Sequence, residues 1–210
     1  MRSIKRILSG LTLCLVASVM PLYAQIPADV KPILDKVEEW FDDKDGIDIN
    51  MTGKVMTAKV ATRSRTKGDK ALVSMSMSML GKTFEMQMGC DGKQTWTYDP
   101  QEGTLTIEKD TEMKKNDNSV DMKLVSEYKK AKMKTTDNAY EITLTEPKSK
   151  EAPSKMVLTA RRSDCRPTEM TMGSGLKKLT FTIVSIKKGV PDNVFVLDTS
   201  KFPNIKIIKK

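Results

Sequence analysis

Histidine is missing from the sequence altogether. Its absence removes the commonest general base and a common metal ligand, and it excludes every catalytic triad that depends on an imidazole. The sequence also has no CxxC pair and no glycine-rich phosphate-binding loop. No pair of carboxylates stands out that could hydrolyse a glycosidic bond. We therefore expect a protein that is not an enzyme and that holds neither a metal ion nor an organic cofactor.

Long apolar runs are also lacking, except at the N-terminus. Arg2, Lys5 and Arg6 precede an apolar stretch from Ile7 to Val19, and a small residue, Ala24, follows four positions after Met20. This order is typical of a cleavable secretory signal, because the apolar stretch is shorter than the ~20 residues that a membrane-spanning helix needs. We predict a signal peptide over residues 1–24 and a soluble, exported mature protein, expected to be a monomer, over residues 25–210.

Cysteine is scarce. Cys14 lies inside the apolar run of the signal, and we interpret it as an ordinary signal residue rather than a lipidation site. Cys90 and Cys165 remain in a compartment where disulfides persist, and the sequence leaves open whether they form a disulfide or stay as two buried thiols.

The charge is positive. Removing the signal takes away three basic residues and no acidic ones, so the net charge falls from +9 to +6. In an exported protein this balance indicates anionic lipid headgroups, acidic proteins or simple solubility, and we expect no nucleic-acid partner.

The hydrophobic pattern changes its period once along the chain. Residues 28–41 place apolar side chains at helical spacing and predict one amphipathic helix. From Ile47 onward the period is two, and short strands alternate with turns such as Gly81-Lys82 and Asp91-Gly92. The later strand candidates are 139–145, 155–160, 167–173, 178–186, 194–197 and 205–208.

One charged segment interrupts this strand pattern. Residues 109–136 are rich in Lys and Asp, and Ser119 to Met133 is the only part with helical spacing. Because successive strands with tight turns form antiparallel meanders, we predict a single α+β domain. It would be a strongly curved antiparallel sheet with helices packed on its concave side.

Methionine is abundant where aromatic residues, at 5%, are few. The alternation places Met75, Met77 and Met79 on one face of a strand, and Phe84, Met86 and Met88 on one face of the next. Met170 and Met172 form a third group. Methionine adapts to ligands of variable shape, so these strands could line a cavity for acyl chains, but an ordinary core that uses Met explains them equally well.

Three stretches of the sequence resemble the LolA-like lipoprotein carriers of the bacterial periplasm. They are the opening helix at 30–37, the turn and strand Asp91-Gly92-Lys93-Gln94-Thr95-Trp96-Thr97-Tyr98-Asp99-Pro100, and the C-terminal stretch 191–205 with its Phe195, Asp198 and Pro203. Their order and spacing, together with the signal peptide, carry the resemblance.

The resemblance implies a half-open antiparallel barrel, closed by an N-terminal helix and a lid helix, whose interior receives the acyl chains of lipoproteins. It implies partners among the lipoprotein-sorting proteins of the inner and outer membranes. The expected lid residues are Val120, Leu124 and Tyr128. The expected cavity residues are Met75, Met77, Met79, Phe84, Met86, Met88, Trp96, Tyr98, Met170 and Met172.

The sequence also departs from the family. Its best-known members hold the lid shut with an arginine on an early strand, and neither Arg63 nor Arg65 matches that position clearly. Two alternatives to a carrier therefore stay open. One is a regulatory or envelope-assembly protein on the same fold that acts through a protein-binding surface. The other is a hydrolase whose catalytic carboxylates the sequence does not reveal.

Overall fold

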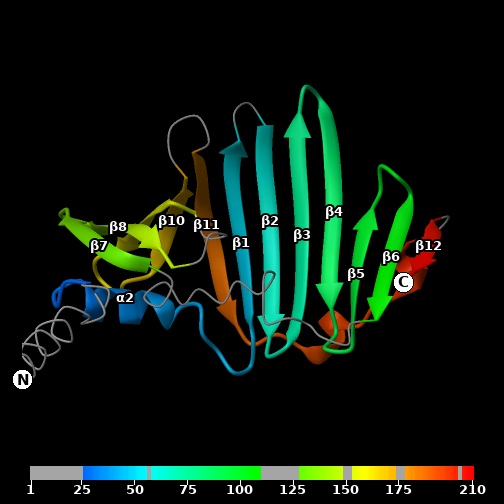
Figure 1. Ribbon diagram of the computed structural model, residues 1–210, viewed down its shortest axis with the longest axis horizontal. Helices are drawn as coiled ribbons and strands as arrows, with labels where there is room; N and C mark the ends of the chain where they lie inside the picture. Colours follow the sequence, from blue (N-terminus) through cyan, green and yellow to red (C-terminus); the bar gives the residue numbers. More distant parts are fainter. Residues whose placement is uncertain (1–25, 56–57, 110–127, 149–152, 174–177, 203–204) are drawn as a thin grey trace, which may run out of the picture.

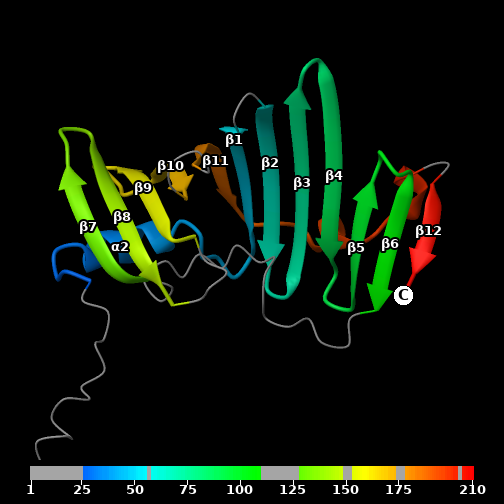
Figure 2. The ribbon, with the colours of Figure 1, turned by 45° about the horizontal axis from the view of Figure 1, so that its top comes forward.

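The computed structural model describes residues 26–55, 58–109, 128–148, 153–173, 178–202 and 205–210. Its strands form one sheet of twelve, in the order β12-β6-β5-β4-β3-β2-β1-β11-β10-β9-β8-β7 (Figure 1). All neighbours are antiparallel except β12, which runs parallel to β6 at one edge (Figure 2). The sheet does not close, since β7 and β12 stand at its two edges.

The elements follow one another in a meander, with one α-helix before the strands. The helix is α2 (Lys31–Glu38), and the first strands are β1 (Ile47–Val55), β2 (Ala58–Lys67), β3 (Lys70–Met79), β4 (Lys82–Cys90), β5 (Gln94–Asp99) and β6 (Thr104–Lys109). The later elements are β7 (Tyr128–Thr135), β8 (Ala139–Pro147), β9 (Lys155–Arg161), β10 (Pro167–Met172), β11 (Leu179–Lys188), the 3-10 turns η2 (Asp192–Phe195) and η3 (Thr199–Lys201), and β12 (Lys206–Lys209).

A tight hairpin sets the register of the two methionine-rich strands. Leu80 and Gly81 join β3 to β4, and both have a positive φ, 52° and 76°. Two central residues with positive φ are typical of the hairpin turn whose twist matches that of the flanking strands. The turn pairs Met77 with Phe84 and Met75 with Met86, so the two strands are in phase, as the sequence predicted.

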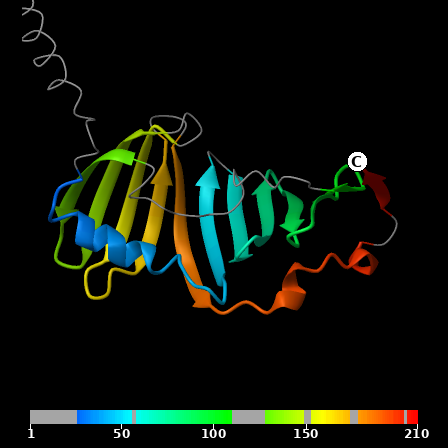
Figure 3. The same ribbon diagram turned by 60° about the horizontal axis from the view of Figure 1, so that its bottom comes forward.

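The two faces of the sheet carry different covers. Helix α2 lies at one end of the sheet, and the C-terminal segment, residues 190–202, follows the other end (Figure 3). Leu34 and Val37 of α2 are fully buried in a core with Ile49 of β1 and Leu158 of β9. We call the face that carries these partners the helix-side face.

The C-terminal segment covers the opposite face. Phe195 packs with Leu72 of β3, Trp96 of β5 and Leu105 of β6 in a second core. Ile49 of the helix-side face opposes Ser64, and Ser64 opposes Val73, so Val73 lies on the helix-side face. Leu72 precedes Val73 in the same strand. Because successive strand residues point to opposite faces, Leu72 and its partners lie on the other side, which we call the tail-side face.

Most of the predicted elements are confirmed, with three corrections. Helix α2 is shorter than the expected 28–41, and residues 194–197 are not a strand because the 3-10 turn η2 extends from Asp192 to Phe195. Residues 128–133 belong to strand β7 instead of a helix. In β7, Ala131 and Met133 alternate with exposed or half-exposed lysines, a pattern suited to an edge strand. Residues 119–127 of the expected lid helix lie outside the described residues.

Candidate functional site

One continuous apolar row crosses nine strands on the helix-side face. Each residue pairs directly with the next across the sheet, and directly opposed residues in a ladder share a face. From β7 to β4, the row reads Met133, Ile142, Leu158, Met170, Phe181, Gly53, Val60, Met77 and Phe84. The predicted methionine strands therefore extend the same surface that forms the core beneath α2.

Helix α2 covers one half of this surface, from β7 to β1. The other half, on β3 and β4, consists of Met75, Met77, Met79, Phe84, Met86 and Met88, which we call the methionine surface. Three of its side chains are substantially exposed: Met75 at 37%, Met79 at 39% and Met86 at 41%. Among the described residues, no helix covers this half.

Six of the ten predicted cavity residues thus lie together on the methionine surface. Met170 and Met172 share the helix-side face, but they belong to the covered half. Met170 is buried in the core under α2, and Met172 packs against that core.

Trp96 and Tyr98 do not share a face with the methionine surface. Thr97, not its aromatic neighbours, opposes Met88, while Tyr98 opposes Gln87 and Trp96 opposes Gly89. The two rings therefore lie on the tail-side face, where they pack against Phe202 with centroid distances of 6.2 Å from Trp96 and 4.6 Å from Tyr98. The sequence showed that the two rings share a face but not which one.

The predicted lid residues do not form a lid in the part of the chain that the structure describes. Tyr128 is a core residue of β7, 1% exposed, and its hydroxyl donates a hydrogen bond to the Pro153 carbonyl at 3.0 Å. Val120 and Leu124 lie outside the described residues.

Arginines 63 and 65 of β2 point away from the methionine surface. Arg63 donates to both carboxylate oxygens of Asp48 on β1, with its Nε 2.9 Å from Oδ1 and a terminal nitrogen 2.6 Å from Oδ2. This hydrogen-bonded pair, opposed by the partial burial of the carboxylate, lowers the pKa of Asp48. Arg65 opposes Asp48 in the ladder, and Arg63 contacts the same carboxylate, so both arginines lie on the tail-side face.

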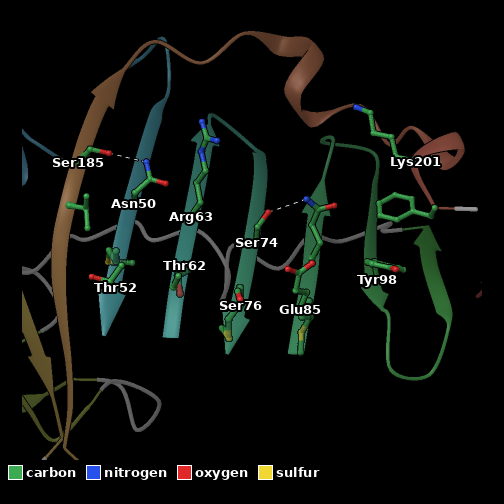
Figure 4. A pocket seen from close by; sticks show the side chains of 17 residues that line it. Asn50, Thr52, Thr62, Arg63, Ser74, Ser76, Glu85, Tyr98, Ser185 and Lys201 are labelled. Carbon is green, nitrogen blue, oxygen red and sulfur yellow. Dashed lines mark hydrogen bonds between the residues drawn. The ribbon is translucent and has the colours of Figure 1, made fainter. Parts of the chain in front are cut away.

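The tail-side face contains a groove that the sequence analysis missed. It has a volume of about 850 Å³ and crosses β11, β1, β2, β3, β4 and β5 up to Lys201 and Phe202 (Figure 4). Its floor carries hydroxyl and amide groups, among which Asn50 donates to Ser185 at 2.9 Å and Gln87 to Ser74 at 3.0 Å. The sequence signal for this groove was the set of serines that alternate with the methionines on β3.

Cys90 and Cys165 are both buried and do not form a disulfide with each other, so the structure shows the alternative of two buried thiols. Cys165 belongs to the core under α2, and desolvation there raises the pKa of its thiol. Cys90 sits at the end of β4, where the Gly92 amide donates to its sulfur.

No group of three or more acidic or cysteine side chains that could hold a metal ion occurs among the described residues. Within the same residues, none of the helices has the length and apolar character required to cross a membrane.

No family model matches the sequence, and no curated protein does so either. Solved structures do. An uncharacterized conserved protein from Thermus thermophilus is 12% identical, with a TM-score of 0.50, over 87% of this chain and 99% of that chain. A LolA superfamily protein from Nitrosomonas europaea is 13% identical, with a TM-score of 0.40, over 80% and 97%. The MucA/MucB complex of Pseudomonas aeruginosa is 11% identical, with a TM-score of 0.41, over 82% and 62%.

At these identities the likeness concerns the fold alone. The similarity in fold to the Thermus protein covers nearly the whole length of that protein. A LolA superfamily protein is among the structures that this chain resembles.

Proposed function

We propose that this protein is a non-enzymatic periplasmic carrier that binds acyl chains of lipoproteins or lipids on its methionine surface and conveys them towards the outer membrane. One observation carries the proposal. The apolar row of the core continues without a break through Val60, Met77 and Phe84, beyond the last residue that α2 covers. An apolar surface of this kind normally marks a binding site.

The side chains suit a ligand that must be released again. Burying an acyl chain contributes about 0.8 kcal/mol for each CH₂ group, so the affinity grows with chain length without any polar contact. Methionine is unbranched and polarizable, and it repacks around different chains more readily than branched residues do. In this proposal residues 1–24 direct export, residues 25–210 form one carrier domain, and lipoprotein-sorting proteins at both membranes are its partners.

A second candidate function is an envelope regulatory or assembly protein that acts through a protein-binding surface. The edge strand β7 favours it, because four lysines are exposed there: Lys129, Lys130, Lys132 and Lys134. Lys130 forms an ion pair with Glu146. Such a row would attract an acidic partner protein.

Native mass spectrometry of the protein purified from its host periplasm tests the carrier proposal. We expect the wild-type protein to carry bound lipid or acylated protein. The double variant Met77→Asp/Met86→Asp should lose it, because two carboxylates would have to be desolvated under the ligand.

The matched control is Ser78→Asp/Gln87→Glu, which adds the same charge to the same two strands on the opposite face. The control should retain the bound lipid. A wild-type protein with no bound lipid and no uptake of added lipopeptide would contradict the carrier and leave the protein-binding function.

A further inference from the structure

A second binding site lies on the tail-side face, beneath the C-terminal segment. A recess of about 280 Å³ is enclosed between the sheet, with Arg65, Gln87 and Trp96, and the C-terminal segment, with Asp198 and Lys201. Gln87, Lys201 and Phe202 also line the large groove, so the recess and the groove adjoin. No residue of the methionine surface lines the recess, and the site does not depend on the proposed carrier function.

Two hydrogen-bond donors in the recess lack a partner among the described residues. They are the indole Nε1 of Trp96 and the Nε of Arg65, and both atoms are buried. Trp96 itself is only 4% exposed. Buried donors are almost always paired because an unpaired one destabilises the fold, so two in one recess indicate a missing acceptor.

The geometry of one cross-strand row brings these donors to the same place. Trp96, Gly89, Leu72 and Arg65 oppose one another in turn from β5 to β2. The indole edge that carries Nε1 lies over Gly89, where a Cβ would stand 2.2 Å from Cζ2 and 2.7 Å from Nε1. Glycine at position 89 therefore lets the indole N–H reach across β4, towards β3 and the recess.

The positive charge of Arg65 is not matched by a carboxylate. Its ladder partner on β1 is Asp48, but Arg63 occupies both oxygens of that carboxylate. Burial, together with the nearby charge of Arg63, lowers the pKa of Arg65, as expected for a guanidinium that lacks a close counter-ion.

The rest of the recess does not supply that counter-ion. Asp198 accepts hydrogen bonds from the amide and the hydroxyl of Ser200, at 3.1 and 2.6 Å, and lies 3.8 Å from Lys201. The lining of the recess contains two cations, Arg65 and Lys201, and one anion, Asp198, so it carries one excess positive charge. The acceptor that the recess lacks is therefore an anionic oxygen group, and a guanidinium fork matches a carboxylate particularly well.

The groove indicates what kind of molecule carries that group. Beside the charged side chains of Arg63, which is paired with Asp48, and Glu85, the floor presents hydroxyl and amide groups that both donate and accept hydrogen bonds. These groups belong to Asn50, Thr52, Ser74, Ser76 and Gln87. A ligand with many hydroxyl groups is complementary to such a floor.

We propose that the recess and the groove together bind an acidic saccharide. Arg65 and the Trp96 N–H donate hydrogen bonds to its carboxylate, and the polar groups of the groove floor bind its hydroxyl groups. The C-terminal segment closes the site from above, held at its start by Asp192, which accepts from Lys67 at 2.9 Å and from Lys70 at 2.7 Å.

Isothermal titration calorimetry of the purified protein with a glucuronic acid oligosaccharide tests this site. We expect binding that weakens as salt is raised, and at least tenfold weaker binding of a neutral glucose oligosaccharide of equal length. Arg65→Gln should weaken acidic saccharide binding at least tenfold. The control Lys59→Gln removes a charge from the same strand and the same face outside the recess, and it should change the affinity less than twofold.

Trp96→Phe keeps an aromatic ring on β5 and removes the N–H together with part of the indole, so it should also weaken binding and provides a second test if Arg65→Gln does not fold. Met77 and Phe84 belong to the methionine surface and line neither the recess nor the groove. The double variant Met77→Asp/Phe84→Asp should therefore bind the saccharide normally, which separates this site from acyl-chain binding.

Equal affinity for the neutral oligosaccharide, or equal effects of Arg65→Gln and Lys59→Gln, would overturn the proposal. So would equally tight binding of inorganic phosphate, which would reduce the site to one for simple anions. Binding of a short peptide through its terminal carboxylate, without binding of the saccharide, would overturn it as well.

Discussion

The two halves of the helix-side face share one sheet and one apolar row, yet they are built from different residues. The half under α2 contains Ile142, Leu144 and Leu158, each fully buried, while the half on β3 and β4 is mainly half-exposed methionine. Branched side chains have few rotamers and specify one packing, whereas methionine tolerates many. The comparison indicates that one half stabilises the fold and the other is free to bind.

The largest difference between the halves should appear in stability. Leu158→Ala leaves a cavity in the middle of the covered half and should lower the free energy of unfolding by about 2–5 kcal/mol. Met86→Ala removes a side chain that is 41% exposed and should cost less than about 1 kcal/mol. Urea unfolding monitored by circular dichroism measures both. Equal losses would mean that the methionine surface is a core like the other.

A smaller effect is expected at the boundary between the halves. Gly53 occupies the apolar row on β1, and a Cβ there would stand 2.5 Å from the Thr180 carbonyl oxygen and 2.8 Å from the Phe181 ring. Gly53→Ala should therefore destabilise the protein by about 1–3 kcal/mol, because the sheet must move to make room.

Gly103→Ala is the control for Gly53→Ala. Gly103 lies in the turn before β6, where a Cβ would meet no atom within 4 Å, although its φ of 61° adds backbone strain. Thermal unfolding of both variants compares crowding in the row with strain in a turn. If Gly53→Ala unfolded at the same temperature as the wild-type protein, the expected crowding at position 53 would be contradicted.

The sequence predicted a meander of short antiparallel strands, the hairpin at Gly81 and the grouping of the six methionine-surface residues, because all of these follow from a period of two and from local turn chemistry. It did not predict the face of Trp96 and Tyr98, since that depends on how β5 pairs with β4. Residues 128–133 were misassigned because Val120, Leu124, Val125 and Tyr128 recur at helical spacing, which predicts a helix that continues through Tyr128. The recess was beyond prediction because Arg65, Trp96 and Lys201 meet only through the sheet register and the path of the C-terminal segment.

The smallest expected effect concerns the cover of the tail-side face, which surface ion pairs help to hold. Hydrogen bonds from Lys70 and Lys67 lower the pKa of Asp192 from 3.8 to about 2. A depressed carboxyl pKa stabilises the native state above the unfolded pKa, and this contribution is lost as the pH falls from about 4 through about 2.

In a Trp40→Phe background, the emission of Trp96 reports on the packing of the C-terminal segment. We expect this emission to change between pH 4 and pH 2, and to change less with pH when Asp192→Asn is added. An identical profile in both proteins would show that Asp192 does not hold the segment.

The most direct test of the central claim is NMR of the protein labelled with ¹³C at its methionine methyl groups, titrated with an acylated lipopeptide. The account predicts that the resonances of Met75, Met77, Met79, Met86 and Met88 shift together, while those of Met51, Met156 and Met170 in the covered half stay in place. Shifts confined to the covered half, or no shifts at a saturating concentration of the lipopeptide, would contradict the claim that the methionine surface binds acyl chains.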